Sequence, residues 1–459
     1  MSMNPLGLKE IIAVDLETTG LDPSSDRITE IAALRARGGE IVDKFTTLVN
    51  PGVAIPYGVS RLTGITDDMV RDAPSEEEAL AELLEFLGEA PILGHNIDFD
   101  AGFITTRSRA QGSDFAGGPR IDTASAARLL YPAAVGFSLG KLAELFGIVL
   151  EGAHRAENDA LATFRLAKSL WRRLLSFPPD LFSRIQILIA ASADPHLSRW
   201  IEAAASLETG REDPPEVNPE VMANFDNILG ESADPESCNM TENDVIGFLG
   251  EDSPLAELLP GFAVRDVQIE MAQGVADSLE YDLFLSVEAG TGTGKSFAYL
   301  LPAAVFASRS GEKVVVSTKT KNLQEQLFFK DLPVLRKALP FDFRSVLLKG
   351  RGNYLCRHRL ERLAADFSSL SYDDRAALAK ILVWSRETES GDIAEVNAVN
   401  PAYHPGLWSK IRSEGPTCMG KRCRFFDYCF LQRARSAVVD SQIVVVNHVL
   451  LFAELQDSI

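Results

Sequence analysis

The sequence predicts an α/β protein with more than one domain. Its 459 residues exceed the usual size of a single domain, and 46% of them are hydrophobic, which is enough for two or three cores. Over residues 1–175, β-branched apolar runs alternate with stretches of helical periodicity. A second strand–loop–helix pattern, rich in glycine, begins near residue 283. This alternation predicts sheets covered by helices in both parts of the chain.

The first part of the chain predicts a small sheet. The β-branched run Ile11–Val14 is expected to form its first strand. The segments Arg27–Arg37 and Ile41–Val49 flank a Gly-Gly turn, so we expect them to pair as neighbouring antiparallel strands. The run Pro91–Leu93 predicts a short buried strand.

Helices and an acidic linker are expected after this sheet. Residues Ala156–Leu174 alternate apolar and basic side chains at helical spacing, which predicts an amphipathic helix, and Leu181–Leu207 is also expected to be helical. Between Glu208 and Asp252 there are thirteen acids against Arg211 alone, so this segment holds −12 of the net charge of −20. The segment predicts a largely solvated linker, in which Cys238 is expected to be a free thiol. The global acidity therefore says little about surfaces that bind nucleic acid.

Carboxylates gather at the ends of predicted elements. Asp15 and Glu17 stand at i and i+2 after the first strand, so both side chains point to one face, as in divalent-metal sites. Asp100 follows a predicted strand, Asp159 begins the amphipathic helix, and His154 precedes that helix. Brought together, the four carboxylates can hold two divalent ions for an in-line phosphoryl displacement. His154 can then deprotonate the attacking water, and the all-oxygen ligands favour magnesium or manganese.

An isolated Asp-x-Glu pair usually belongs to a solvated surface or a cap, but three ordered motifs favour a site. The motifs are Asp15-Leu-Glu-Thr-Thr-Gly20, His95-Asn-x-x-Phe-Asp100 and His154-x-x-x-x-Asp159. Together they resemble the three exonuclease motifs of the DEDDh (DnaQ-like) family, and residues 62–66 are also similar to that family. The resemblance covers residues 8–175 and implies a ribonuclease H-like fold and 3′→5′ removal of nucleotides with two metal ions. It implies that the metal-organising residues are Asp15, Glu17, Asp100 and Asp159, that His154 is the general base, and that Thr18 contacts nucleic acid.

The second part of the chain carries a phosphate-binding loop. The sequence Ala289-Gly-Thr-Gly-Thr-Gly-Lys-Ser296 follows the apolar run Leu283–Val287, a predicted strand, and precedes a helical pattern. Its glycines allow backbone N–H groups to wrap a phosphate at a helix N-terminus, where a lysine reaches the outer phosphates and a serine ligates magnesium. The predicted ATP-binding residues of this loop are Gly290, Gly292, Thr293, Gly294, Lys295 and Ser296.

Flanking residues resemble those of superfamily 2 helicases, in which the Ala-first form of this loop occurs. Phe262-x-x-Arg265-x-x-Gln268 is similar to the segment that reads adenine, which implies that Arg265 and Gln268 bind ATP. The strand Val314–Ser317 with the following Thr318 and Lys319 resembles the elements that contact a single-strand backbone.

Four cysteines form a separate feature. They are Cys356, Cys418, Cys423 and Cys429. The last three fall inside a single stretch of twelve residues, which is basic and polar. The residues alone leave scattered buried thiols, a zinc site and an iron–sulfur cluster open. Their arrangement, with Gly350-Arg-x-Asn-Tyr354 before and Ile443–His448 after, resembles the cluster domain of DinG-type helicases, relatives of XPD. The resemblance implies a 4Fe–4S cluster, with zinc as the runner-up.

The helicase part resembles only a portion of that family. No Asp-Glu dipeptide occurs in the chain, so the D-E-A-H motif expected after Asn447-His448 is missing, as is a second motor domain. We therefore expect a fused exonuclease–DinG helicase that stops midway through its first motor domain. The predicted organisation is an exonuclease domain (1–175), a helical and then acidic linker (176–245), the first part of the motor (246–355), an iron–sulfur region (356–430) and a returning strand (431–459).

The predicted function is a metal-dependent 3′→5′ exonuclease acting on single-stranded DNA ends, fused to an ATP-binding DinG-like helicase module, in DNA repair or replication. One alternative is an ATP-dependent 5′→3′ DNA helicase with an accessory nuclease, and another is a helicase part that binds without catalysis. RNA stays open as a substrate, because no 2′-OH contact is legible in the sequence. Few cysteines, no signal peptide and no apolar stretch of membrane-spanning length predict a cytoplasmic protein without a membrane partner.

Overall fold

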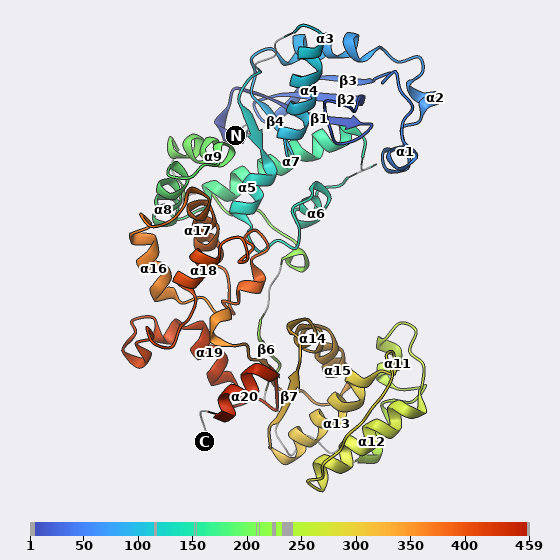
Figure 1. The fold of residues 1–459 in the computed structure, drawn as a ribbon, viewed down its shortest axis with the longest axis vertical. Helices are drawn as coiled ribbons and strands as arrows, with labels where there is room; N and C mark the ends of the chain where they lie inside the picture. Colours follow the sequence, from blue (N-terminus) through green and yellow to red (C-terminus); the bar gives the residue numbers. More distant parts are fainter. Residues whose placement is uncertain are drawn as a thin grey trace. The chain divides into compact units, whose positions relative to one another are not determined.

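The computed structural model describes residues 5–113, 117–150, 152, 154–207, 209–210, 212–222, 226–231 and 242–456 (Figure 1). The chain divides into two compact units. The first consists of Met1–Asn224, Arg362–Glu387 and Ala394–Lys410, and the second of Phe225–Glu361, Thr388–Ile393 and Ile411–Ile459. Cys238 lies outside the described residues.

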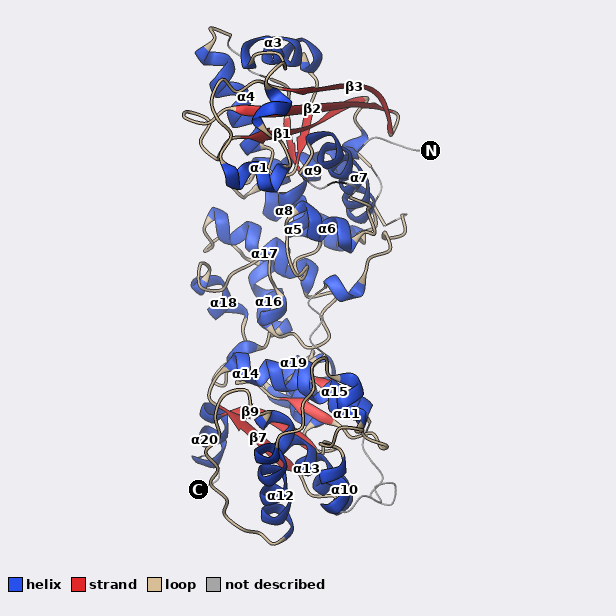
Figure 2. Cartoon of the chain, turned by 90° about the vertical axis from the view of Figure 1, so that its right-hand side faces the viewer, coloured by secondary structure: helices blue, strands red, loops and turns tan. Residues whose placement is uncertain are grey.

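The first unit is built on a five-stranded sheet in the order β3-β2-β1-β4-β5. Figure 2 shows β1, β2 and β3 of this sheet. Strands β1 (Glu10–Thr18), β2 (Ile28–Arg37) and β3 (Glu40–Leu48) are antiparallel. Strand β4 (Ile92–Gly94) runs parallel to β1, and β5 (Arg120–Asp122) runs parallel to β4. The predicted strands and their hairpin are confirmed, and the sheet is the ribonuclease H-like α/β fold that the sequence predicted.

Helices cover both faces of this sheet (Figure 1). Helices α3 (Glu76–Leu87) and α4 (Asp98–Ala110) pack on the face that carries Ile12, Val14 and Leu16 of β1. Because strand side chains alternate, Asp15 and Glu17 point to the other face, which α7 (Ala156–Leu175) covers. The smaller helices are α1 (Tyr57–Thr63), α2 (Asp67–Val70), α5 (Thr123–Leu130) and α6 (Leu139–Leu145).

A further helical layer belongs to the same unit. The helical prediction for Leu181–Leu207 is confirmed by α8 (Pro179–Ala190) and α9 (Pro195–Ala205). Helix α17 (Tyr372–Trp384) packs against α8 and α5, and eight of its residues are buried. Arg375 donates 2.9 Å to the carbonyl of Ala191, and Arg386 pairs with Asp180 at 2.5 Å. Thus part of the region between Cys356 and Cys418 packs with helices of the first unit, while the predicted domain boundaries stay a prediction.

The second unit has a four-stranded mixed sheet in the order β6-β8-β9-β7. Strands β7 (Val314–Thr318) and β8 (Ser345–Leu347) run parallel to β9 (Ile443–Asn447), and β6 (Ile228–Leu229) is antiparallel to β8. The predicted strands at 314–317 and 443–446 are therefore confirmed. The longest helices here are α12 (Asp266–Glu280) and α13 (Lys295–Ser310), which pack together.

Shorter elements complete the chain. The remaining α-helices are α10 (Glu242–Gly247), α11 (Pro254–Leu258), α14 (Lys321–Gln326), α15 (Leu332–Ala338), α16 (Arg357–Ala365), α18 (Pro405–Ile411), α19 (Phe430–Ala437) and α20 (His448–Gln456). Other helical turns are η1 (Pro5–Gly7), η2 (Pro219–Val221), η4 (Leu327–Asp331), η5 (Arg351–Asn353), η6 (Ile393–Glu395), η7 (Gly420–Arg422) and η8 (Phe426–Tyr428). None of the helices in the described ranges has the length and apolar character to span a membrane.

Two expectations are corrected. The run Leu283–Val287 is not a strand: it is irregular, Phe284 is fully exposed, and no described strand pairs with it. Without a neighbouring strand its backbone groups have no ladder partners, so the apolar pattern alone cannot make it a strand. The acidic segment is also less solvated than expected, because α10 lies within it and buries Val245.

Candidate active site

Three separate segments carry the predicted exonuclease residues. Asp15 and Glu17 lie half-buried on β1, and Asp100 is buried in the first turn of α4. Oδ1 of Asp100 accepts the backbone N–H of Leu16 at 3.0 Å, which joins the start of α4 to β1. The loop before α4 is held by Asp122, whose Oδ1 accepts the N–H of Asn96 at 2.7 Å. The fold therefore places the second motif beside the first.

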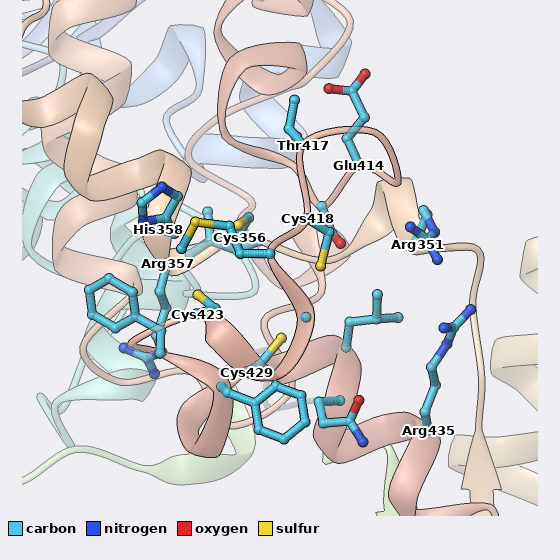
Figure 3. Close-up of a pocket in the computed structure, with 18 residues that line it drawn as sticks. Arg351, Cys356, Arg357, His358, Glu414, Thr417, Cys418, Cys423, Cys429 and Arg435 are labelled. Carbon is cyan, nitrogen blue, oxygen red and sulfur yellow. The ribbon is translucent and has the colours of Figure 1, made fainter.

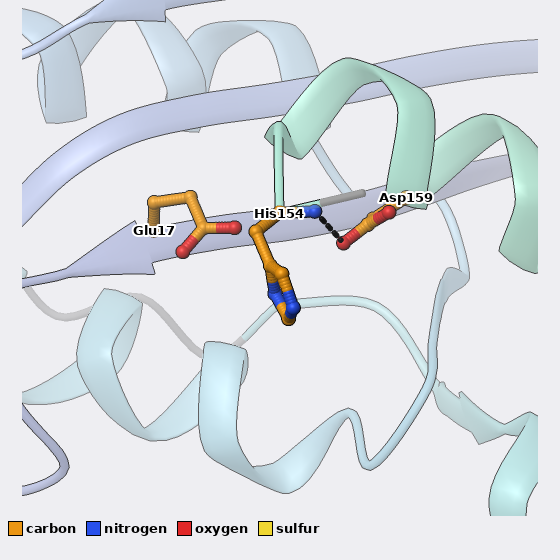
Figure 4. Close-up of side chains that lie close together, drawn as sticks. All are labelled: Glu17, His154 and Asp159. Carbon is orange, nitrogen blue, oxygen red and sulfur yellow. Dashed lines mark hydrogen bonds between the residues drawn. The ribbon is translucent and has the colours of Figure 1, made fainter. Parts of the chain in front are cut away.

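The third motif completes the cluster. One ligand atom each of Glu17, His154 and Asp159 lies within 4.8 Å of the others (Figure 4). The backbone N–H of His154 donates to Oδ2 of Asp159 at 3.2 Å, and the side chain of His154 is exposed. His154 has a φ of +66°, in the left-handed region that non-glycine residues rarely occupy. The loop is therefore bent so that an accessible imidazole stands beside two carboxylates.

Burial and mutual repulsion raise the pKa of every carboxyl group in the cluster. Burial, followed by the charges of Asp100, Asp159 and Glu17, raises the pKa of Asp15 well above its usual range. Burial raises the pKa of Glu17 to about 7 and that of Asp100 to about 8. The pKa of Asp159 is raised as well, mainly by burial, although the N–H of His154 opposes the shift. A bound cation would offset the repulsion between carboxylates held this close together.

The residues present fit divalent metal ions. Within the described part of the chain, the buried Oδ1 of Asp159 has no hydrogen-bond partner. The surrounding donors are carboxylate oxygens, the ligands that magnesium and manganese prefer. An unpartnered carboxylate oxygen among like charges fits the role of a cation ligand. The ligands for such ions would be Asp15, Glu17, Asp100 and Asp159.

A fifth acid, Glu30, lies beside the cluster and is absent from the sequence-based set. It stands opposite Glu17 in the β1–β2 register and is buried. The guanidinium of Arg155 binds both of its carboxylate oxygens. A lone acid within the apolar run of residues 28–34 is the sequence signal that could have identified it.

Two polar residues of the motifs are engaged within the fold. The hydroxyl of Thr18, a predicted nucleic-acid contact, is buried and donates 2.6 Å to the carbonyl of Gly20. The ring nitrogens of His95 lie 2.9 Å from Oγ1 of Thr123 and 2.8 Å from the carbonyl of Phe137, and burial lowers its pKa. His95 therefore holds the loop together, whereas His154 is the accessible imidazole.

The predicted phosphate loop precedes α13 in the second unit. Gly292 and Gly294 have φ values of +81° and +77°, which favour glycine. Nζ of Lys295 donates to the carbonyls of Ala289 at 2.9 Å and Gly290 at 2.5 Å. The lysine thus turns into its own loop, where phosphate oxygens could replace these carbonyls.

Of the residues expected to contact ATP or single strands, some are buried and others are exposed. Gln268 is buried and its Nε2 donates 2.9 Å to the carbonyl of Gly294, so it touches the phosphate loop. Arg265 lies exposed at the start of α12. Thr318 is buried at the end of β7 with its hydroxyl bonded to the carbonyl of Thr320, whereas Lys319 is exposed.

The four cysteines line one cavity of about 190 Å³ in the second unit (Figure 3). All four are free thiols, and burial raises the pKa of Cys356. Arg351, His358 and Arg435 also line this cavity. The structure therefore brings Cys356 together with the later three, although about sixty residues separate them in sequence.

Comparisons with known proteins agree with this geometry. Residues 12–167 match the family RNase_T, described as exonuclease. The chain is 29% identical over 453 residues to a Bacillus subtilis (strain 168) protein named 3′-5′ exonuclease DinG, covering 97% of this chain and 48% of the relative. A Staphylococcus aureus (strain USA300) protein of the same name is 27% identical over 456 residues, covering 99% and 49%.

The chain spans about half the length of the curated relatives it matches. Among solved structures, exonuclease X in complex with 5′ overhanging duplex DNA is similar over 35% of this chain and 90% of that chain, with 26% identity and a TM-score of 0.29. Within the present chain, the match at residues 12–167 contains all five residues of the predicted active site. The chain therefore carries an exonuclease domain of the RNase_T type and is homologous over nearly all of its residues to DinG proteins named 3′-5′ exonucleases.

Proposed function

We propose that this chain is a metal-dependent 3′→5′ exonuclease that removes nucleotides from single-stranded DNA ends. The convergence of Glu17, His154 and Asp159, drawn from β1 and from the start of α7, carries the proposal. Asp15 and Asp100 add two carboxyl groups whose pKa values are raised by burial and, to a lesser extent, by neighbouring acidic charges. The names of the relatives agree with the proposed direction of cleavage.

Each protein group has a distinct task in the proposed reaction. Divalent ions held by the four carboxylates would stabilise the attacking and leaving oxygens of an in-line phosphoryl displacement. The imidazole of His154, accessible beside Glu17, accepts a proton from the attacking water as general base. Asp159 holds the backbone N–H of His154 and thereby fixes where that imidazole stands.

We infer that the second unit binds ATP at the phosphate loop. Gly294 has a φ of +77°, which favours glycine, and a Cβ atom added there would lie 2.3 Å from Nε2 of Gln268. Lys295 and Ser296 stand at the N-terminus of α13, where the helix favours a phosphate charge. The proposal is limited to ATP binding and does not extend to ATP turnover.

We also propose that the cysteine cavity holds a 4Fe–4S cluster rather than zinc. The four free cysteines line one cavity of this unit, and the resemblance of their arrangement to the cluster domain of DinG-type helicases favours the cluster. Four thiolates are the usual ligands of such a cluster. Equal iron and acid-labile sulfide in purified protein would support the cluster, and stoichiometric zinc would overturn it.

The test of the nuclease is shortening of a 3′-labelled DNA single strand with magnesium or manganese, with and without ATP. We expect ATP-independent shortening that is abolished by EDTA and by Asp15→Ala but not by Lys295→Ala. Loss of activity in the Lys295 variant, or no shortening by the unaltered chain, would refute the proposal. A labelled RNA strand of the same sequence, run in parallel, decides whether the 2′-OH is tolerated.

A further inference from the structure

Glu30 and Arg155 form a well-defined ion pair beside the active site. Nε of Arg155 lies 3.1 Å from both Oε1 and Oε2 of Glu30, and its Nη2 lies 2.6 Å from Oε1. The side chain of Glu30 is only 9% exposed, whereas that of Arg155 is 43% exposed. Such a two-point contact fixes the plane of the guanidinium as well as its position.

Without Arg155, the negative charge of Glu30 would destabilise the folded sheet. Glu30 stands directly opposite Glu17 in the antiparallel β1–β2 pair, so their side chains share one face. Like charges directly opposite each other destabilise a sheet. Arg155 offsets the charge of Glu30, and the N–H of Ala156 donates to its Oε2 at 3.0 Å. A buried acid placed against this cost indicates a specific task.

The residue next to Arg155 in the chain indicates what the Glu30–Arg155 pair does. His154 immediately precedes it and has a φ of +66°, a strained conformation for a residue with a Cβ atom. Asp159 holds the N–H of His154 at 3.2 Å. Glu30 holds the next two residues, Arg155 through its side chain and Ala156 through its N–H. The strained residue is thus held at its own N–H and through the two residues that follow it.

We propose that Glu30 and Arg155 are positioning residues that hold the imidazole of His154 beside Glu17 and Asp159. The inference rests on the proposed role of His154 as general base. A base works only within hydrogen-bond reach of the proton that it accepts, roughly 2.6–3.2 Å, and a misplacement of about 1 Å can cost about 100-fold in rate. The pair acts through His154 and does not itself touch the reacting atoms.

The kinetic test uses the full chain and the 3′-labelled single strand with manganese. We expect Glu30→Ala and Arg155→Ala to lower kcat by about 10- to 100-fold with KM within about twofold, as loss of base positioning predicts. Glu30→Gln, which keeps an oxygen for the N–H of Ala156, should recover part of the loss. The matched control is Lys44→Ala, which removes an exposed ion pair of 2.7 Å between Lys44 on β3 and Glu157 on α7. The kcat of this variant should be unchanged.

Epistasis separates positioning from general destabilisation. In a His154→Ala background, Glu30→Ala should cause no further loss, because the group that it positions is already gone. A further loss as large as that in the unaltered chain would overturn the inference, and so would a Lys44→Ala effect equal to that of Glu30→Ala. If His154→Ala and the unaltered chain are active to the same extent, the proposed function of His154 fails instead.

A readout independent of activity comes from hydrogen exchange of residues 154–159. We expect Glu30→Ala and Arg155→Ala to speed exchange of the amide of His154, while Lys44→Ala leaves it unchanged. Unaltered exchange in both variants overturns the inference even where the chain does not cleave DNA. Manganese binding by the two variants, measured by calorimetry, should persist, because the four proposed ligands are intact. Loss of that binding would also overturn a role limited to His154.

Discussion

The backbone N–H of Leu16 donates a hydrogen bond of 3.0 Å to Oδ1 of Asp100, a residue 84 positions further along the chain. This bond lies between Asp15 and Glu17 and ties the second motif to the strand that carries the first. Asp100 thereby becomes a buried member of a crowded carboxylate cluster, and burial raises its pKa to about 8. The hydrogen bond to Leu16 positions Asp100 in the site, whereas the ionised carboxylate of Asp100 lowers the stability of the folded protein.

The first prediction concerns pH. Because the pKa values of Glu17 and Asp100 are raised to about 7 and about 8, the folded state binds more protons than the unfolded state above about pH 4. Stability of the metal-free protein should therefore fall as pH rises from about 4 to 8. We expect Tm of the first unit to be at least about 2–4 °C lower at pH 8 than at pH 5, the shift that about 1 kcal/mol produces.

The Asp100→Asn variant isolates the contribution of one carboxyl. Its side chain can still accept the N–H of Leu16 but cannot ionise, so the decrease in Tm from pH 5 to pH 8 should shrink. Asp43→Asn, an exposed residue on β3, serves as the control. A decrease of equal size in Asp100→Asn and the unaltered chain would contradict the assigned pKa.

The second prediction concerns metal. Manganese at about 100 times its dissociation constant should raise the free energy of unfolding by about 2.7 kcal/mol at pH 8, because it binds the folded cluster. His154→Ala should retain this stabilisation and lose nuclease activity, since its imidazole is the proposed base rather than a ligand. Thermal unfolding with and without EDTA measures the stabilisation by manganese in the unaltered chain and in His154→Ala. Equal stabilisation of Asp15→Ala would show that manganese binds elsewhere.

The third prediction concerns the helical layer of the first unit. Leu378 on α17 is fully buried, and removing such a side chain costs about 2–5 kcal/mol. Leu378→Ala should therefore speed hydrogen exchange in α8 and α5, against which α17 packs. Tyr403→Ala, at a residue of the same unit that is 81% exposed, should not. Unchanged exchange in α8 and α5 of Leu378→Ala would refute the docking of this helix.

The fourth prediction concerns the phosphate loop. Gly294→Ala should weaken ATP binding at least about tenfold, because a Cβ atom would meet Gln268 and the φ of +77° disfavours alanine. Gly247→Ala introduces the same methyl group in α10, where nothing lies within 4 Å, and should bind ATP normally. Calorimetric titration with ATP gives both constants. Equal affinities would mean that the loop does not form the nucleotide site.

Local patterns predicted much of the first unit and less of the second. The strands at Ile11–Val14 and Arg27–Arg37 were readable because alternation and a Gly-Gly turn are features of neighbouring residues. Leu283–Val287 has the same apolar character, yet it is no strand, because a strand needs a partner that the sequence pattern cannot supply. Helix α17 has no single apolar face, because its buried residues run almost without interruption from Ala376 to Trp384, so its pattern indicates burial but not the surface that it packs against.

The sequence by itself determined the chemistry of this protein: four acids and a histidine in ordered motifs, a glycine-rich phosphate loop and four cysteines. Only the tertiary structure decided how these groups are held. The left-handed turn at His154, the placement of Glu30 opposite Glu17 and the packing of α17 on α8 all arise from residues far apart in the chain. Short-range periodicity carries no record of such contacts, because their energies depend on which surfaces the folded chain brings together.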